Sequence, residues 1–239
     1  MGVPSVKFLN LSSHDLSQRV YRIIPVERLF QLFETGKNVL VSPKKWEDPF
    51  ENVVLRSIFP RLGLYGQCWT RHTASDAMWR IYSPQIGGIR IRTTVQTLFN
   101  SLVKATPRTG ARPFIGSVKY LSDQSLIRFA RSAVADANSD PAECARTLLV
   151  KRRAFQHERE VRLIAVEIGE HRGQELLAYD TNPQAIIDQM MLDPRLAEAE
   201  ADRLRDRIRK RTGFKGEILR SLLYTLPPEL SRLAKTRGS

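Results

Sequence analysis

Hydrophobic residues recur along the first half of the chain at the two spacings that distinguish strands from helices. Short apolar or alternating runs predict strands at residues 20–24, 38–42, 64–70 and 89–94. Between the first two runs, apolar residues at positions 26–33 recur three and four apart, and Gly36 follows where a helix commonly ends. The pattern therefore predicts a strand, a helix and a second strand in succession.

The same two spacings continue to mix in the second half. Further strands are predicted at residues 114–121, 157–168, 175–179, 186–192 and 217–224. Helices are predicted at residues 75–82, 95–103, 123–130, 142–152 and 197–210. Helices and strands interleave without the strict alternation of a doubly wound fold. We therefore predict an α+β fold, a single domain with a mixed or mainly antiparallel central sheet flanked by helices.

Composition fits one globular domain. We divide the 239 residues into an N-terminal extension at 1–19, the α+β domain at 20–226 and a basic C-terminal tail at 227–239. The chain is 42% hydrophobic and 26% charged, which excludes a disordered chain. Cys68 and Cys144 are too few for a disulfide scaffold or a four-cysteine zinc site. No run approaches the roughly 18 apolar residues of a membrane span, so we expect a soluble cytoplasmic protein.

The charge balance points to a polyanionic partner. Lys and Arg number 38 against 25 Asp and Glu, a net charge of +13, and 28 of the 38 are Arg. Guanidinium groups bind phosphates in pairs of hydrogen bonds, so nucleic acid is the partner that the charge favours. Candidate contacts are Arg152, Arg153, Arg205, Arg209 and Lys210. The alternative is that these residues lie on exposed helix faces, where neighbouring acids partly balance them.

Two aromatic segments carry candidate pocket residues. Asp48 and Glu51, three apart around Pro49, are typical of a helix start, but they also suit a polar pocket or a metal site. Trp79 and Tyr82 share one face of a predicted helix near Thr70. That spacing is usual for core packing, but such rings also form the walls of ligand pockets.

The segment at residues 155–163 is the most informative. Glu158 and Glu160, one residue apart, are expected on one face of a strand with Arg162 next along it. A surface ladder of charges is the alternative, but a strand as apolar as the one that follows is buried, and charges at its mouth favour a cleft. The second histidine of a zinc-binding HExxH motif is missing, and the four histidines show no metal-ligand spacing.

At these residues the chain resembles the bacterial domain-of-unknown-function family twenty-nine seventy-one. The segments that carry the resemblance are Tyr21-Arg22, Trp46 to Glu51, Cys68-Trp69-Thr70, Met78 to Tyr82, Gly88 to Ile91 and His157 to Leu163. The similarity extends over about residues 20–226. The family name implies no activity.

The order of these segments also resembles that of ADP-ribosyltransferase-like domains, in which an early strand carries Arg or His and a later one carries a Glu-x-Glu motif. The usual Ser-Thr-Ser motif is reduced to Thr70. The resemblance implies NAD as co-substrate and a toxin or antiviral defence effector that modifies nucleic acid or an associated target. It implies catalytic roles for Glu160, Glu158 and Arg22, and cofactor contacts from Tyr21, Arg22, Thr70, Trp79 and Tyr82.

In these roles, Glu160 would stabilise the oxocarbenium-like transition state and Glu158 would activate the acceptor nucleophile. Arg22 would bind the diphosphate, and Tyr82 or Trp79 would stack on the nicotinamide. This chemistry requires no metal.

Two other functions remain open on the sequence. A metal-dependent nuclease would hold divalent ions with Asp48, Glu51, Glu158 and Glu160. A non-catalytic module would instead bind nucleic acid or a protein partner through its basic residues, and an acidic protein or antitoxin would suit the charge.

Overall fold

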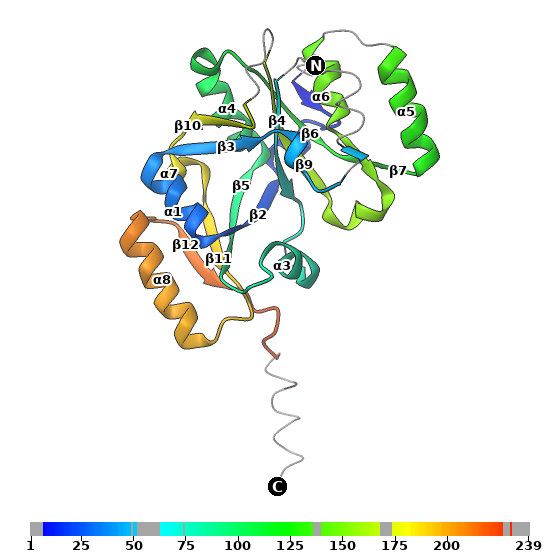
Figure 1. Cartoon of the computed structure of the whole chain (residues 1–239). Helices are drawn as coiled ribbons and strands as arrows, with labels where there is room; N and C mark the ends of the chain where they lie inside the picture. The colour runs from blue at the N-terminus through cyan, green and yellow to red at the C-terminus, as the bar shows by residue number, and fades with distance from the viewer. Residues whose placement is uncertain are drawn as a thin grey trace.

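The computed structural model describes residues 7–48, 50–51, 63–73, 75–135, 140–167, 174–226 and 230. Most of these residues form a strongly twisted sheet with helices on both faces (Figure 1). In the part of the chain so described, no helix is long and apolar enough to cross a membrane.

Within the described residues the main sheet has ten strands. In spatial order the main path is β1 (Phe8–Leu9), β6 (Arg112–Ser117), β9 (Glu160–Glu167), β4 (Gly63–Thr70), β2 (Arg19–Pro25), β5 (Gly88–Thr94), β11 (Gln189–Leu192) and β12 (Glu217–Arg220). A branch leaves β4 through β3 (Lys37–Val41) and β10 (Leu176–Asp180). The β1–β6 and β11–β12 pairs are parallel and the other pairs are antiparallel, so the predicted α+β fold with a mainly antiparallel sheet is confirmed.

The sheet parts between β2 and β4. β4 pairs with β9 over its whole length, and β2 pairs with β5 in the same way. In contrast, β2 and β4 share one register pair, Tyr21 with Thr70, and β3 meets β4 at one pair, Val41 with Gly66. Two halves of the sheet therefore diverge from a narrow junction, which leaves an opening between them.

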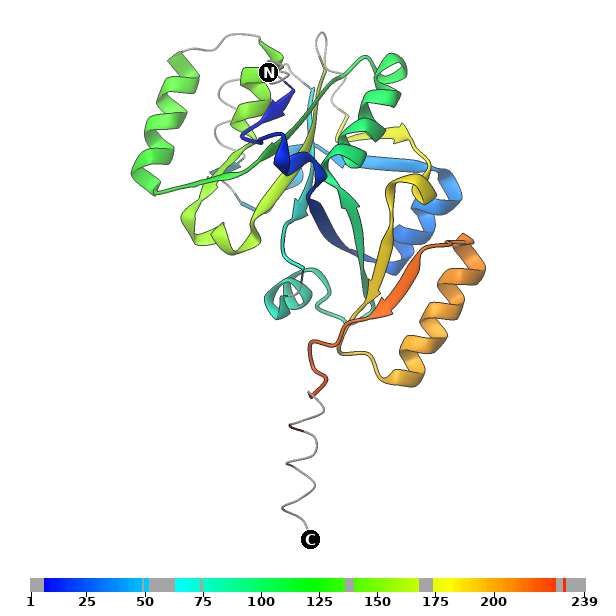
Figure 2. The ribbon, with the colours of Figure 1, turned by 180° about the vertical axis from the view of Figure 1, so that it is seen from behind.

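Helices cover both halves. The longer ones are α1 (Val26–Thr35), α4 (Val95–Thr109), α5 (Asp123–Ala135) and α8 (Glu198–Thr212), and the shorter ones are α3 (Asp76–Tyr82), α6 (Pro141–Thr147) and α7 (Pro183–Ile186). Single 3-10 turns occur at η1 (His14–Ser17), η2 (Pro43–Lys45) and η3 (Arg153–Glu158). The views from front and back place α8 and α5 at opposite sides of the molecule (Figures 1 and 2). A separate parallel pair, β7 (Lys119–Leu121) with β8 (Val150–Arg152), lies beside α5.

Local signals explain several element boundaries. Helix α1 ends at Gly36, whose φ of 62° is the left-handed conformation that glycine adopts at low cost. Helix α4 begins at Thr94, whose hydroxyl accepts a hydrogen bond from the Thr97 amide at 3.1 Å. That helix was expected to end at residue 103, but it continues to Thr109 with Pro107 inside its last turn, which costs the helix one amide hydrogen bond.

Several other boundaries differ from the expected ones. The helix predicted at residues 142–152 ends at Thr147, and its last residues form strand β8. The strand predicted at residues 157–168 begins only at Glu160, because η3 occupies the preceding residues. The extension assigned to residues 1–19 contains β1, which pairs with β6 in the main sheet. The tail boundary at residue 227 stays a prediction, since of residues 227–239 the structure describes residue 230 alone.

Candidate active site

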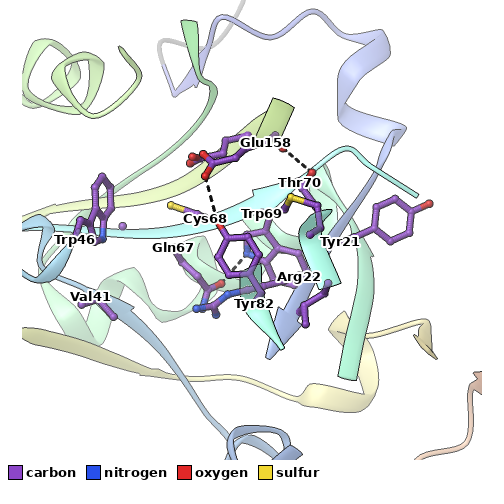
Figure 3. Close-up of a pocket in the computed structure, with 14 residues that line it drawn as sticks. Tyr21, Arg22, Val41, Trp46, Gln67, Cys68, Trp69, Thr70, Tyr82 and Glu158 are labelled. Carbon is purple, nitrogen blue, oxygen red and sulfur yellow. Dashed lines mark hydrogen bonds between the residues drawn. The ribbon is translucent and has the colours of Figure 1, made fainter. Parts of the chain in front are cut away.

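A cavity of about 240 Å³ occupies the opening between β2 and β4, under helix α3 (Figure 3). Its lining comes from both halves of the parted sheet, from α3, from η3 and from the segment after η2. The residues are Tyr21, Arg22, Ile23, Val41, Trp46, Gly66, Gln67, Cys68, Trp69, Thr70, Met78, Tyr82, Glu158 and Glu160. Six of the seven residues that the sequence analysis proposed for catalysis or cofactor contact therefore line one cavity.

Strand register explains how distant residues meet there. Tyr21, Thr70 and Glu160 are successive register partners across β2, β4 and β9, so they form one row on one face of the sheet. Arg22, one residue further along β2, would by simple alternation face the other side. Because β2 and β4 part immediately after the Tyr21–Thr70 pair, Arg22 instead lines the cavity that the row of residues also lines.

Arg22 is a half-buried cation with no acidic partner among the residues that the structure describes. Burial lowers the pKa of its guanidinium, and no carboxylate is among the main groups that shift this pKa. Considering the described residues alone, the Arg22 side chain makes no hydrogen bond or ion pair. A desolvated charge that lacks a partner is costly, so its place in a cavity wall suits an anionic ligand. Figure 3 shows Arg22 and Glu158 on opposite sides of the cavity.

The backbone brings the two carboxylates together by a sharp change of conformation. Glu158 is the last residue of η3, Arg159 takes a left-handed conformation with φ of 45°, and Glu160 begins β9. The Thr70 hydroxyl donates to the Glu158 carbonyl at 2.6 Å, and the Glu160 amide donates to the Tyr120 hydroxyl at 2.8 Å. The expectation of one shared strand is thus wrong for Glu158, but both side chains still line the cavity.

Buried cations hold these carboxylates. Lys151 Nζ lies 2.5 Å from Glu158 Oε2 and 2.8 Å from Glu160 Oε1. Arg162 Nε lies 2.6 Å from Glu160 Oε2, which confirms the expected shared face of Glu160 and Arg162, and a terminal nitrogen of Arg162 lies 2.5 Å from Glu51 Oε1. All five side chains are at least nine-tenths buried. They form a network of ions behind one wall of the cavity.

The two carboxyls differ in acidity. Burial, reinforced by the charge of Glu160, raises the pKa of Glu158 to about 7. Burial also acts to raise the pKa of Glu160, but Arg162, a hydrogen bond from Glu158 and Lys151 together lower it well below its usual value. Glu160 is therefore ionised at neutral pH, while Glu158 exchanges its proton near neutrality. Such a divided pair is typical of acid and base groups in active sites.

Aromatic side chains flank the cavity. Tyr82 projects from α3 with 41% of its surface exposed, and its hydroxyl donates to Glu158 Oε1 at 3.4 Å. Trp46 lies on the other side, where its ring packs under the Arg162 guanidinium at 4.5 Å. Figure 3 shows both rings beside the space between Arg22 and Glu158. The rings offer flat surfaces to a planar ligand group.

The rear wall of the cavity is polar, and its polar side chains form hydrogen bonds with one another. Trp69 Nε1 donates to Gln67 Oε1 at 2.8 Å, and Gln67 Nε2 donates to Asn38 Oδ1 at 2.8 Å. Asn38 in turn donates to the Tyr179 hydroxyl at 2.7 Å. Cys68 completes the wall, and burial followed by the charge of Glu160 raises the pKa of its thiol, so it is a poor nucleophile at neutral pH.

Trp79 was expected to contact the cofactor, but the structure places it outside the cavity lining. It is 1% exposed and packs with Ile23 and Met78, outside the cavity lining. Its face of α3 turns toward the sheet, whereas Tyr82 at the end of the helix is free to reach the cavity. Core packing, the alternative for this residue, is therefore its role.

Of the basic residues predicted to contact nucleic acid, some already bind other groups of the protein and some do not. Arg152 pairs with Asp48 at 3.0 Å, while Arg205 and Arg209 donate to backbone carbonyls next to α8. Arg153 and Lys210 are exposed, and neither has an ion-pair partner in the described stretches. Arg153 follows β8, beside α5, and Lys210 lies on α8 at the opposite side of the molecule (Figure 1). These residues therefore do not form one continuous basic surface.

The four carboxylates considered for a metal site do not suit one. Asp48 pairs with Arg152, and Glu51, Glu158 and Glu160 share Lys151 and Arg162. To bind a metal ion, each of these carboxylates would have to break its ion pair with a lysine or an arginine. Within the described ranges, no group of three or more His, Cys, Asp or Glu residues is arranged to hold a metal. Asp48 also accepts a hydrogen bond from the Phe50 amide at 3.1 Å, as the helix-start alternative predicts.

Sequence reasoning missed Lys151 and Gln67. Lys151 lay in a segment predicted as helix, and nothing local indicates that it reaches two glutamates. Gln67 lies inside an apolar strand, and a polar residue within such a run is the signal that could have drawn attention to it.

Comparisons with known proteins agree in part with the resemblances. Residues 78–163 match the model of a family described as "Protein of unknown function (DUF2971)", which confirms the first resemblance over that range. No curated protein matches the chain.

Solved structures of DarT from Thermus sp. 2.9 are similar to this chain. The complex with ADP-ribosylated ssDNA has 10% identity and a TM-score of 0.40, over 86% of this chain and 94% of that one. The complex with carba-NAD+ has 12% identity and a TM-score of 0.40, over 86% and 96%. The complex with NAD+ has 11% identity and a TM-score of 0.37, over 86% and 96%.

Proposed function

We propose that this protein is an ADP-ribosyltransferase-like enzyme that uses NAD to modify a nucleic acid or a nucleic-acid-associated target. One observation carries the proposal. At one end of a single cavity lies a half-buried arginine with no acidic partner among the described residues. At the other end lie two glutamates, of which Glu160 is ionised at neutral pH and Glu158 has a pKa of about 7.

The charges of NAD match these two ends. Its diphosphate is anionic and suits Arg22, whose planar guanidinium can form paired hydrogen bonds to phosphate. Its nicotinamide ring is cationic and planar, and it suits the space beside the carboxylates between Tyr82 and Trp46. The 240 Å³ volume is slightly below the ~300–1,000 Å³ of pockets for drug-sized ligands. The cavity would hold the nicotinamide ribose half of NAD, and the adenosine half would extend across the mouth of the cavity.

The reaction follows from the roles of the two glutamates. The bond between ribose C1′ and the nicotinamide nitrogen breaks, and its electron pair goes to the ring, which leaves as neutral nicotinamide. Ionised Glu160 stabilises the positive charge that develops on the ribose in the transition state. A nucleophilic oxygen or nitrogen of the acceptor then forms a bond to C1′ and loses its proton to the Glu158 carboxylate.

The acceptor is proposed from charge. A net charge of +13 attracts polyanions over distance, and Arg153 and Lys210 remain available for phosphate contacts. An acidic protein that neutralised this surface would suppress binding of the acceptor, as expected of a partner that restrains a toxin.

Label transfer tests the proposal. The protein is incubated with NAD labelled in the adenylate, together with single-stranded DNA, duplex DNA, RNA or cell lysate. We expect covalent label on one acceptor class, reduced about 100-fold or more in Glu160→Gln. The exposed Glu198→Gln on α8 is the matched control and should transfer label like the wild type. If no acceptor gave label transfer or nicotinamide release, the proposed enzyme activity would be refuted.

A further inference from the structure

The bridging ammonium of Lys151 distinguishes this site from a simple pair of glutamates. Lys151 comes from β8, in the small two-stranded sheet, and not from the strands that carry the rest of the site. Its Nζ contacts one oxygen of Glu158 and one of Glu160 simultaneously, and it also lies 4.5 Å from the centre of the Phe155 ring. The side chain is 9% exposed, so it is not a surface lysine that happens to find an acid.

The local charge balance depends on this lysine. Three carboxyls, Glu51, Glu158 and Glu160, face two cations, Lys151 and Arg162. If all three carboxyls ionise, the buried network carries a negative charge, and one retained proton makes it neutral. Removing Lys151 would leave three carboxyls facing one cation, which favours retention of a further proton.

Among the residues that the structure describes, no other cation takes the place of Lys151. Tyr82 from α3 and Cys68 from β4 face the pair as neutral groups, because burial raises the pKa of each. Tyr120 from β7 is likewise neutral, since burial raises the pKa of its phenol. Arg162 contacts Glu160 and Glu51, while Arg152 is committed to Asp48.

We propose that Lys151 is a positioning residue that fixes the spacing of Glu158 and Glu160 and supplies the positive charge that they share, so that one carboxylate serves the ribose and the other the acceptor. This inference rests on the proposed function. Lys151 contacts the two glutamates and is absent from the cavity lining, so it acts through them. Its loss should therefore affect turnover more than NAD binding.

Three variants separate charge from packing. Lys151→Met removes the ammonium and keeps the apolar stem, Lys151→Gln keeps hydrogen-bond donors without charge, and Lys151→Arg keeps the charge. Lys119→Met is the matched control, because Lys119 is exposed on β7 in the same small sheet. Urea unfolding of each variant identifies any that fail to fold, and Lys151→Gln replaces Lys151→Met if the latter is unfolded.

Steady-state nicotinamide release provides the first measurement. We expect kcat to fall about 10- to 100-fold in Lys151→Met and Lys151→Gln, with KM for NAD within about twofold of the wild type. Lys151→Arg should stay within about tenfold, and Lys119→Met should be unchanged. The inference is overturned if kcat in the folded uncharged variants equals that of the wild type, or if KM rises with unchanged kcat.

Carboxyl ¹³C NMR of glutamate-labelled protein provides a second measurement, which does not need turnover. The Glu158 resonance, assigned by its loss in Glu158→Gln, should titrate at higher pH in Lys151→Met than in the wild type. An unchanged midpoint would overturn the role of Lys151 even if the enzyme is active. A raised midpoint in a protein that never releases nicotinamide would keep the positioning role and reject the proposed chemistry.

Discussion

Thr70 donates its hydroxyl proton to the backbone carbonyl of Glu158 at 2.6 Å, and the same residue faces Glu160 in the β4–β9 register. One threonine thus connects both members of the glutamate pair to the strand that forms the cavity wall. Since the bond reaches the backbone at the end of η3, it holds the turn that orients Glu158 and not the carboxylate itself.

Replacing Thr70 with valine tests this connection. The substitution keeps the shape but leaves the buried Glu158 carbonyl without its donor, which should lower the unfolding free energy by about 1–3 kcal/mol. Turnover should fall with it, because Glu158 loses its fixed position. Urea unfolding and nicotinamide release measure the two effects. Thr35→Val is the control, since the Thr35 hydroxyl donates to the Gln31 carbonyl in an exposed turn, and a larger loss there would contradict the account.

Replacing Gly66 with alanine tests the role of the Trp46 ring. A Cβ at residue 66 would lie 2.7 Å from Cζ2 of Trp46, so the ring must move within the cavity wall. We expect a loss of about 1–3 kcal/mol in unfolding free energy and weaker NAD binding. Adding Trp46→Phe, which shortens the ring, should recover stability in the double variant but not binding. If Gly66→Ala bound NAD as tightly as the wild type, Trp46 would have no role in NAD binding.

The pH dependence of stability follows from Glu158. Its pKa in the folded protein, raised mainly by burial to about 7, exceeds its reference value of 4.5. The folded state therefore holds a proton that the unfolded state has lost, so this contribution is complete below about pH 4.5 and disappears as pH rises through about 7. Glu160, with a lowered pKa, contributes in the opposite sense, with stability lost as pH falls.

Comparison of the wild type with Glu158→Gln isolates the first of these effects. Urea midpoints between pH 4.5 and 7.5 should decline more steeply with pH in the wild type than in the variant. The exposed Glu143→Gln should follow the wild type. Identical slopes in the wild type and Glu158→Gln would show that this carboxyl titrates normally. In activity, a base of this acidity predicts that kcat increases with pH through about 7.

Periodicity predicted what local sequence determines. The alternation of β9 placed Glu160 and Arg162 on one face, and Gly36 marked the end of α1, because both depend on neighbouring residues. Glu158 was assigned to the strand because a strand start has no strong local signal, and only the left-handed Arg159 separates it from β9.

The features that build the cavity are not local. The parting of β2 from β4 depends on a register between residues 21 and 70, which no pattern in either strand specifies. Lys151 belongs to a segment whose helical spacing is satisfied up to Thr147, and its contact with two glutamates depends on the pairing of β7 with β8. Arg22 was identified by resemblance, and only the three-dimensional structure shows that no described carboxylate pairs with it.

Equilibrium binding of NAD to Glu160→Gln, with and without Arg22→Gln, tests the central claim most directly, because the first variant slows turnover while the cavity remains. Calorimetric titration at low salt should detect NAD binding to Glu160→Gln. The double variant should lose about 1.5–3 kcal/mol of binding free energy, roughly a ten- to hundredfold weaker Kd, since a charged partner of the diphosphate is gone. Equal affinity of the two proteins, or no binding of NAD to either, would contradict a dinucleotide held between Arg22 and the glutamate pair.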